Sequence, residues 1–192
     1  MGCLRQVLKG TAILLAIVAA AGYFIYHTNW FQKKYLYPLP YAEEVLAAAR
    51  ESEVDPFLIY AVMRTESRYS ANATSPKGAR GLMQIMPETG TWIAGKINLD
   101  GYNGDLLYEP ALNIRLGTWY LASLKDEFEG NIILTLAAYN GGRGNVKQWR
   151  RQYGWPRDFS KTEEIPYQET RQYVTKVLDA YSNYKRLYGP PR

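Results

Sequence analysis

The chain has 192 residues, which suits one folded domain with a short additional segment. Hydrophobic residues make up 47% of it and charged residues 21%, which argues against a disordered or fibrous chain, and the net charge of +5 without a basic stripe argues against nucleic-acid binding. One cysteine and one histidine, with no array of acidic ligands, argue against an intrachain disulfide, a metal site, a cofactor and a catalytic triad.

The first apolar stretch, residues 7–26, is a membrane-targeting segment with Arg5 and Lys9 at its N-terminal end. Two interpretations compete, a signal peptide cleaved before Gly22 and an uncleaved transmembrane anchor. We favour the anchor because apolar residues continue beyond that site to Tyr26. The basic residues before the span predict a single-pass protein of the cell membrane with its folded domain outside the cytoplasm.

These patterns divide the chain into three predicted parts. Residues 1–31 form the anchor or signal segment, and residues 32–40, with two lysines and two prolines, form a semi-rigid spacer. Residues 41–192 form one domain in which apolar residues recur at helical spacing while strand signals are scarce, so we predict an all-α fold. The expected helices lie at residues 42–52, 55–66, 87–98, 110–129, 131–140, 146–153 and from 165 onward. In the helix at 87–98 we expect Trp92 and Ile93 to face inward.

The helix that begins at Asp55 carries a carboxylate on its apolar stripe. Asp55 followed by Pro56 is a helix-start pattern, because the carboxylate accepts from unpaired backbone N–H groups and proline suits the first helical position. Glu66 stands seven residues after Ile59 on the face otherwise given to apolar side chains. Burial there raises the pKa of a carboxyl group, as a general acid working near neutral pH requires.

The same position also suits a structural carboxylate. Such a group is held by a buried cation, and Arg64, Arg68 and Arg80 are the nearby candidates. The spacing alone leaves the catalytic and the structural interpretation of Glu66 equally open.

Two further stretches carry polar groups beside turns. Residues 70–80 form a loop rich in Ser, Asn, Pro and Gly, and residues 81–87 then place a glycine before an apolar turn that carries Gln84. Tyr139 ends the helix at 131–140 beside two glycines, where spacing alone favours a core position with its hydroxyl satisfied.

The segment at residues 99–109 contains two turn dipeptides and is predicted to be a surface loop. Calcium loops also use Asp, Asn and Gly, but here the terminal Glu falls at the wrong interval and Tyr and Leu occupy ligand positions. We therefore expect no calcium site. Tyr102 and Tyr108 are placed to flank a cleft.

In this order and spacing, Glu66–Ser67, residues 75–87 and residues 138–142 resemble the soluble lytic transglycosylase family, relatives of goose-type lysozyme. The resemblance covers roughly Tyr41 to the C-terminus, and Glu169–Val174 matches the family's final motif. It implies a lysozyme-like helical domain behind the N-terminal transmembrane helix or signal peptide. We expect a monomer whose partners are peptidoglycan glycan strands and, through the N-terminal segment, the membrane.

The resemblance also implies a reaction. The bond between N-acetylmuramic acid and N-acetylglucosamine is cut without water, leaving 1,6-anhydro ends. Glu66 acts first as general acid on the glycosidic oxygen and then as general base on the muramyl 6-hydroxyl. The substrate's own N-acetyl group stabilises the cationic intermediate. The implied substrate-binding residues are Ser75, Gln84, Met86, Tyr139, Asn140 and Glu169.

Some alternatives stay open. Asn140 also suits a helix cap, and Glu169 also suits a salt bridge to Arg171 or Arg68. The chain is alternatively a hydrolytic muramidase of the goose-lysozyme type, which admits water to the same intermediate. From another class, it is a glycan-binding scaffold without catalysis, which the presence of Glu66 disfavours.

Overall fold

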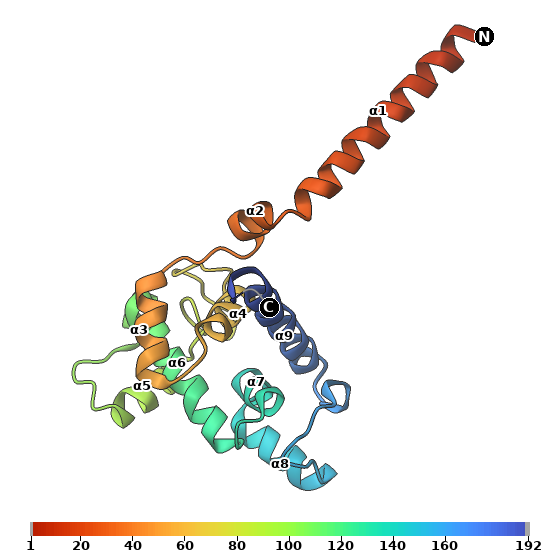
Figure 1. Cartoon of the computed structure of the whole chain (residues 1–192). Coiled ribbons are helices and arrows are strands. Elements are labelled where there is room, and N and C mark those ends of the chain that lie inside the picture. The colour runs from red at the N-terminus through yellow and green to blue at the C-terminus, as the bar shows by residue number, and fades with distance from the viewer. Residues whose placement is uncertain (1, 191–192) are drawn as a thin grey trace. The chain divides into compact units, whose positions relative to one another are not determined.

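The computed structural model describes residues 2–190 of the chain (Figure 1). It divides into two compact units, Met1–Pro38 and Leu39–Arg192. The outer bounds of the predicted segments, residues 1 and 192, lie outside the described residues, as does the side chain of Arg5, on which the predicted orientation partly rests.

The first unit is dominated by α1 (Gly2–Tyr26), one uninterrupted helix. Its window Lys9–Tyr26 spans 18 residues with a mean hydropathy of 1.6, which makes it the one described helix long and apolar enough to cross a membrane. A short helix α2 (Asn29–Phe31) and a π-helical turn η1 (Gln32–Leu36) follow, so part of the predicted spacer is helical.

The second unit is helical. Its elements are α3 (Ala42–Ser52), α4 (Pro56–Glu66), α5 (Pro87–Lys96), α6 (Pro110–Glu127), α7 (Ile132–Gly141), α8 (Arg143–Tyr153) and α9 (Gln168–Tyr188), with the short 3-10 helices η2 (Gly104–Tyr108) and η3 (Thr162–Glu164). Over residues 2–190 there is no strand, only isolated antiparallel bridges that join Arg80 to Thr74 and to Ile85. The predicted all-α fold is confirmed.

The predicted start of α4 is confirmed in detail. The Oδ1 atom of Asp55 accepts from the backbone N–H of Phe57 at 2.8 Å, and Pro56 occupies the first turn. The Oδ2 atom of Asp55 accepts a second hydrogen bond, at 2.7 Å, from the Tyr181 hydroxyl on α9. One carboxylate therefore both begins α4 and ties it to the last helix.

Helix α4 lies in the core, against α9 and α3 (Figure 1). All six residues from Leu58 to Met63 are buried. At its N-terminal half, Tyr184 of α9 is fully buried and stacks on Phe57 and Tyr60 at centroid distances of 6.5 and 5.5 Å. This packing on both sides fixes the direction in which the C-terminal end of α4 points.

Helix α5 differs from its prediction at one position. Ile93 is fully buried as expected, but Trp92 is 37% exposed, so the inward prediction for Trp92 is wrong. Consecutive residues of a helix point about 100° apart, so on a helix that packs on one side a residue next to a buried one can face outward, as Trp92 does beside Ile93. Trp92 instead lies at the surface, against rings of α6.

Candidate active site

Glu66 is the last residue of α4 and is half-buried. Burial raises the pKa of its carboxyl group from 4.5 to about 7, the nearby Tyr173 hydroxyl lowers it in part, and the negative charge of Glu169 raises it. None of these influences is a cation. Of the arginines considered as partners, Arg80 forms an ion pair with Asp105 at 2.9 Å. The electrostatics therefore favour a proton-transferring carboxyl group over a structural ion pair.

The segment that follows Glu66 is fastened to the end of α4. The Ser67 hydroxyl donates to the carbonyl of Leu82 at 2.8 Å. Gln84 takes a left-handed backbone conformation, with φ of 49°, and its side-chain N–H₂ donates to the carbonyls of Ala73 and Gly81 at 3.1 and 2.9 Å. Both amide donors of Gln84 are thus used internally, so toward a ligand its side chain offers an acceptor.

The buried side-chain amide of Asn113, on α6, also holds this segment in place. The Asn113 side chain, with no exposed surface, accepts from the N–H of Met83 at 2.7 Å and donates to the carbonyls of Leu107 and Arg80 at 2.7 and 3.0 Å. Gly81 passes so close that an added Cβ would overlap Leu107 and Asn113, and its φ is 75°. Asn113 thereby holds Arg80 and Met83 of this segment against Leu107 of η2.

Ser75 lies in the polar loop before this segment. Its Oγ accepts from the N–H of Ala79 at 3.0 Å, while its backbone N–H donates to the Ala79 carbonyl at 2.9 Å. The hydroxyl proton of Ser75 is therefore still available as a donor.

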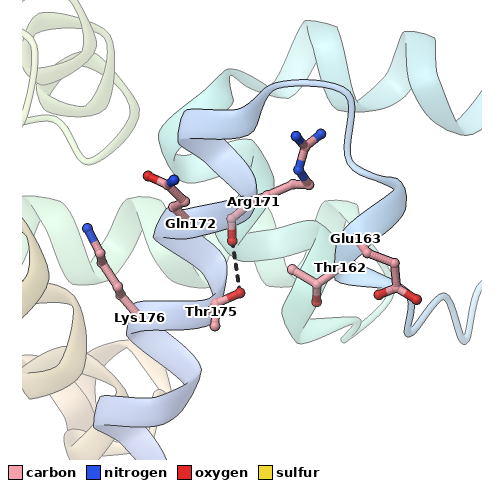
Figure 2. Close-up of a pocket in the computed structure, with 6 residues that line it drawn as sticks. All are labelled: Thr162, Glu163, Arg171, Gln172, Thr175 and Lys176. Atoms are coloured by element: carbon pink, nitrogen blue, oxygen red, sulfur yellow. Dashed lines mark hydrogen bonds between the residues drawn. The ribbon is translucent and has the colours of Figure 1, made fainter.

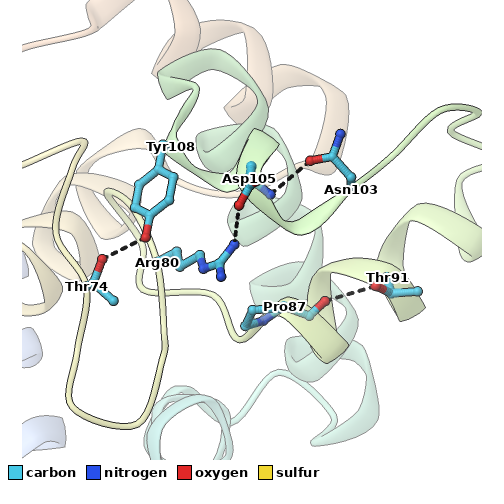
Figure 3. A network of polar contacts seen from close by, with 7 residues as sticks. All are labelled: Thr74, Arg80, Pro87, Thr91, Asn103, Asp105 and Tyr108. Carbon is cyan, nitrogen blue, oxygen red and sulfur yellow. Dashed lines mark hydrogen bonds and ion pairs between the residues drawn. The ribbon is translucent and has the colours of Figure 1, made fainter.

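The loop that carries Ser75 is braced by η2 (Figure 3). The hydroxyls of Thr74 and Tyr108 are hydrogen-bonded at 2.7 Å, and the Arg80 guanidinium, paired with Asp105, also lies 5.5 Å from the Tyr108 ring centroid. Tyr108 therefore supports the loop. The Tyr102 hydroxyl instead packs against Gly90 of α5, in the space that a side chain at that position would fill.

Two tyrosines accompany Glu66. The Tyr139 hydroxyl on α7 donates to the carbonyl of Met83 at 2.9 Å, and burial together with the Glu66 charge holds its pKa well above the ordinary value. Tyr173 on α9 is 7% exposed. Its hydroxyl has no partner at full hydrogen-bond geometry within residues 2–190, but it lies near enough to Glu66 to lower the carboxyl pKa as a donor. Glu66, Tyr139 and Tyr173 form one cluster.

Asn140 joins α7 to α9. Its Oδ1 accepts from the Thr170 hydroxyl at 2.9 Å, and an added Cβ on Gly141 would stand 2.9 Å from the same hydroxyl oxygen. The C-cap of α7 is Gly142, so Asn140 does not cap the helix.

Glu169 is exposed and forms an ion pair with Lys77, the N–O distance being 4.0 Å, rather than with Arg171 or Arg68. A hollow of about 530 Å³ lies between these groups. Its lining is Lys77, Asn140, Gly141, Asn145, Pro166, Tyr167, Gln168, Glu169 and Thr170. Met86, at the N-cap of α5, is half-buried.

The structure thus places Tyr139 and Glu169 each within electrostatic range of Glu66, and Gln84 lies on the braced segment next to Met83, whose carbonyl accepts from Tyr139. Sequence reasoning missed Tyr173, although it stands one helical turn after Glu169. It also treated Asn113 only as part of a scaffold helix, although an amide on a buried helical stripe signals a need for polar partners.

Two other features stay apart from this cluster. A hollow of about 430 Å³ lies along α9 and η3, where none of the predicted site residues lines it (Figure 2). Its Arg171 guanidinium donates to the carbonyls of Ile165 and Pro166. Within the described part of the chain, no group of three or more His, Cys, Asp or Glu side chains is arranged to hold a metal ion.

Comparison with known proteins gives a consistent likeness. Residues 43–161 match the family model described as "Transglycosylase SLT domain". The soluble lytic murein transglycosylase of Escherichia coli K12 is 38% identical over 162 residues, which cover 83% of this chain and 25% of that protein. The membrane-bound lytic murein transglycosylase C of Edwardsiella ictaluri is 33% identical over 168 residues, 77% of this chain and 47% of that protein.

Solved structures show the same likeness in three dimensions. An inactive Glu-to-Gln mutant of the lytic transglycosylase Slt from Pseudomonas aeruginosa has a TM-score of 0.75 and 34% identity, and the match covers 84% of this chain and 26% of that one. The 70-kDa soluble lytic transglycosylase of Escherichia coli has a TM-score of 0.74 and 35% identity, over 80% of this chain and 25% of that one. This chain thus spans about a quarter of the soluble proteins that it resembles.

Proposed function

Because this chain belongs to the Transglycosylase SLT domain family, we propose that it is a peptidoglycan lytic transglycosylase. It would cleave the β-1,4 bond between N-acetylmuramic acid and N-acetylglucosamine without water and leave 1,6-anhydro ends. The observation that carries this proposal is Glu66, a half-buried carboxyl group with a pKa of about 7 beside two tyrosine hydroxyls. Near neutral pH such a group is present in both its acid and its base form.

The proposed reaction uses both forms in turn. Protonated Glu66 donates its proton to the glycosidic oxygen as the bond breaks, and the resulting carboxylate then takes the proton of the muramyl 6-hydroxyl, which closes the anhydro ring. The Tyr173 hydroxyl lowers the pKa of Glu66, so it stabilises the carboxylate between the two steps. Glu66 ends the cycle protonated, ready for the next strand.

Substrate binding is proposed from the hydrogen-bonding capacity left on the loops. Ser75 retains a hydroxyl proton and Gln84 retains an acceptor oxygen. An acetamido group needs both, a donor for its carbonyl and an acceptor for its N–H. Met86 would line the cleft and Tyr139 would orient the reacting sugar. Asn140 and Glu169 border the neighbouring hollow and would contact the adjoining sugar.

One observation favours a second candidate, a hydrolytic muramidase. Glu169 is a second carboxylate within electrostatic range of Glu66, and two carboxylates are what a water-activating glycosidase uses. We favour the transglycosylase because an intramolecular hydroxyl has an effective-molarity advantage over water. A glycan-binding scaffold without catalysis is the third possibility.

The products separate these functions. The full-length chain in detergent, incubated with sacculi, is expected to release muropeptides lighter by one water than lysozyme products and resistant to borohydride. Glu66→Gln is expected to fold normally and to lose on the order of a hundred- to ten-thousand-fold in rate. Reducible muramic acid ends would identify a hydrolase, and fragments released independently of Glu66 would remove its catalytic role.

We also propose that α1 anchors the chain in the cell membrane, with the second unit on the extracytoplasmic side and the protein acting as a monomer. Its length and hydropathy support the anchor. So does the likeness to one relative, a membrane-bound lytic murein transglycosylase.

A further inference from the structure

The juxtamembrane segment, residues 28–37, comprises α2 and η1 and is tied to the end of α1. The Thr28 hydroxyl donates to the carbonyl of Ile25 at 2.7 Å and accepts from the N–H of Phe31 at 3.2 Å, so one side chain joins the end of α1 to α2. The Gln32 side chain is buried, and its N–H₂ donates to the carbonyl of the last α1 residue at 3.5 Å. The segment therefore continues α1 with a defined geometry instead of forming a loose linker.

Aromatic rings of the juxtamembrane segment are exposed next to the C-terminal end of α1. Trp30 is 63% exposed and Tyr35 is 55% exposed, and their rings meet edge-on with 6.0 Å between the centroids. The Phe31 ring lies 4.9 Å from Tyr35 and 5.8 Å from Tyr26, which links the cluster to α1. Trp and Tyr concentrate where acyl chains meet headgroups, because each has an apolar body and a polar edge. The cluster is suited to that depth.

The first unit has a strongly one-sided charge. Every charged side chain in it is basic, namely those of Arg5, Lys9, Lys33 and Lys34. The chain has no acidic residue before Glu43. Lys33 and Lys34 follow the apolar span, whereas basic residues ordinarily favour the cytoplasmic side. The Lys34 ammonium lies 5.1 Å from the Trp30 centroid and 5.3 Å from the Tyr35 centroid. The two lysines thus need a role that the orientation of the span does not supply.

The length of the span sets the depth of the juxtamembrane segment. At 1.5 Å per residue, the 18 residues of Lys9–Tyr26 extend about 27 Å, close to the hydrocarbon thickness of about 30 Å. The segment therefore begins where the hydrocarbon ends, at the level of the lipid phosphates. A basic side chain held there is attracted by anionic headgroups.

We propose that the juxtamembrane segment binds the headgroups of anionic phospholipids in the membrane that α1 spans. Trp30 and Tyr35 lie at the boundary between headgroups and acyl chains, and the ammonium groups of Lys33 and Lys34 pair with the negative charge of the headgroups. The inference rests on the proposed anchoring by α1 and is independent of the reaction at Glu66. It adds a preference for lipids of one charge, which an apolar span alone does not have.

The test identifies the lipid that lies next to Trp30. The full-length chain is reconstituted in liposomes with equal amounts of phosphatidylglycerol, which is anionic, and phosphatidylcholine, which has no net charge. One lipid or the other carries bromine on its acyl chains near the headgroup, where bromine quenches the fluorescence of a neighbouring tryptophan. Trp30→Phe supplies the signal of the other tryptophans, which is subtracted.

We expect brominated phosphatidylglycerol to quench Trp30 more strongly than brominated phosphatidylcholine. The preference should be about fivefold for each lysine near the headgroups, and it should fall as salt is added. Replacement of both lysines, Lys33→Gln with Lys34→Gln, is expected to make the two brominated lipids quench equally.

The matched control is Lys125→Gln with Lys176→Gln, which removes the same charge from two exposed lysines of the second unit and is expected to keep the preference. Equal quenching in the wild type, or a preference that persists without Lys33 and Lys34, overturns the inference. So does an unquenched Trp30 in a chain that floats with the liposomes. A wild-type chain that does not float with the liposomes removes the proposed anchor, and the inference with it.

Discussion

Glu66 keeps its proton to a higher pH than an exposed glutamate because burial raises its pKa from 4.5 to about 7. The folded chain therefore binds more protons than the unfolded chain between these two values, and the free energy of unfolding falls as pH rises through this window. Glu66→Gln removes the titration. We expect this variant to be more stable than the wild type above about pH 7, with the difference shrinking as pH falls from about 7 to 4.5 and absent at lower pH.

Melting temperatures across this pH range measure that difference. Glu43→Gln, which changes an exposed carboxylate at the start of α3, serves as the control and is expected to show no such pH-dependent gain. If the difference in melting temperature between Glu66→Gln and the wild type stays constant with pH, the raised pKa of Glu66 is contradicted.

Tyr173 affects the pKa of the Glu66 carboxyl group. Its hydroxyl lowers the Glu66 pKa, so Tyr173→Phe is expected to raise that pKa further and to move the pH optimum of turnover upward, because the base step needs the carboxylate. The pH profile of kcat measures the shift. Since the hydroxyl lacks a partner at full geometry within residues 2–190, its removal is expected not to lower the melting temperature.

The matched control for Tyr173→Phe lies two turns further along α9. Tyr181→Phe loses the hydrogen bond to Asp55, so it is expected to cost about 1 kcal/mol of stability and to leave the pH optimum in place. Identical behaviour of the two variants would show that the Tyr173 hydroxyl acts only through packing.

At the scale of elements, α6 positions the loops through one side chain. Asn113→Ala would leave the N–H of Met83 and the carbonyls of Arg80 and Leu107 without their partner in a buried place. Each such loss costs about 1–3 kcal/mol, so we expect a destabilisation of about 3 kcal/mol or more. Urea unfolding measures it. A partly exposed amide on α9, whose hydrogen bonds lie at the surface, provides the control, since Asn183→Ala is expected to stay within about 0.5 kcal/mol of wild type.

Local rules predicted the elements well. Helix α3 has the predicted bounds, and α4 begins with the predicted cap at Asp55, because both depend on side chains next to each other in sequence. Periodicity also predicted that Glu66 shares a face with the buried Ile59.

Contacts between distant segments were not predictable in this way. Asn113 bonds the backbone of Met83 and Arg80, which lie some thirty residues earlier in the chain. The spacing of Asn113 in the sequence does not indicate these partners. Tyr173 is one of 17 tyrosines, and its place beside Glu66 is set by the packing of α9 rather than by its own spacing. The outward orientation of the Trp92 side chain likewise depends on the position of α6, whose Trp119 it contacts.

At the scale of the whole molecule, the proposed topology makes its own prediction. If α1 is an uncleaved anchor, a reporter enzyme fused after Arg192 is expected to be active only when it is of a kind that needs an extracytoplasmic setting. A reporter restricted to the cytoplasm serves as the opposite control, and its activity would contradict the orientation. Detection of a mature chain that starts at Gly22 would replace the anchor by a cleaved signal.

The position of Asn113 also bears on how this fold tolerates change over generations. Core substitutions along α6 that shift the helix slightly carry Met83 and Arg80 with it, because all three are joined through buried hydrogen bonds. A displacement of about 1 Å near a reacting group lowers rates about a hundredfold, whether or not the chain stays folded. We therefore expect substitutions that accumulate along α6 to abolish activity before they unfold the chain, so that the resulting variants are folded but inactive.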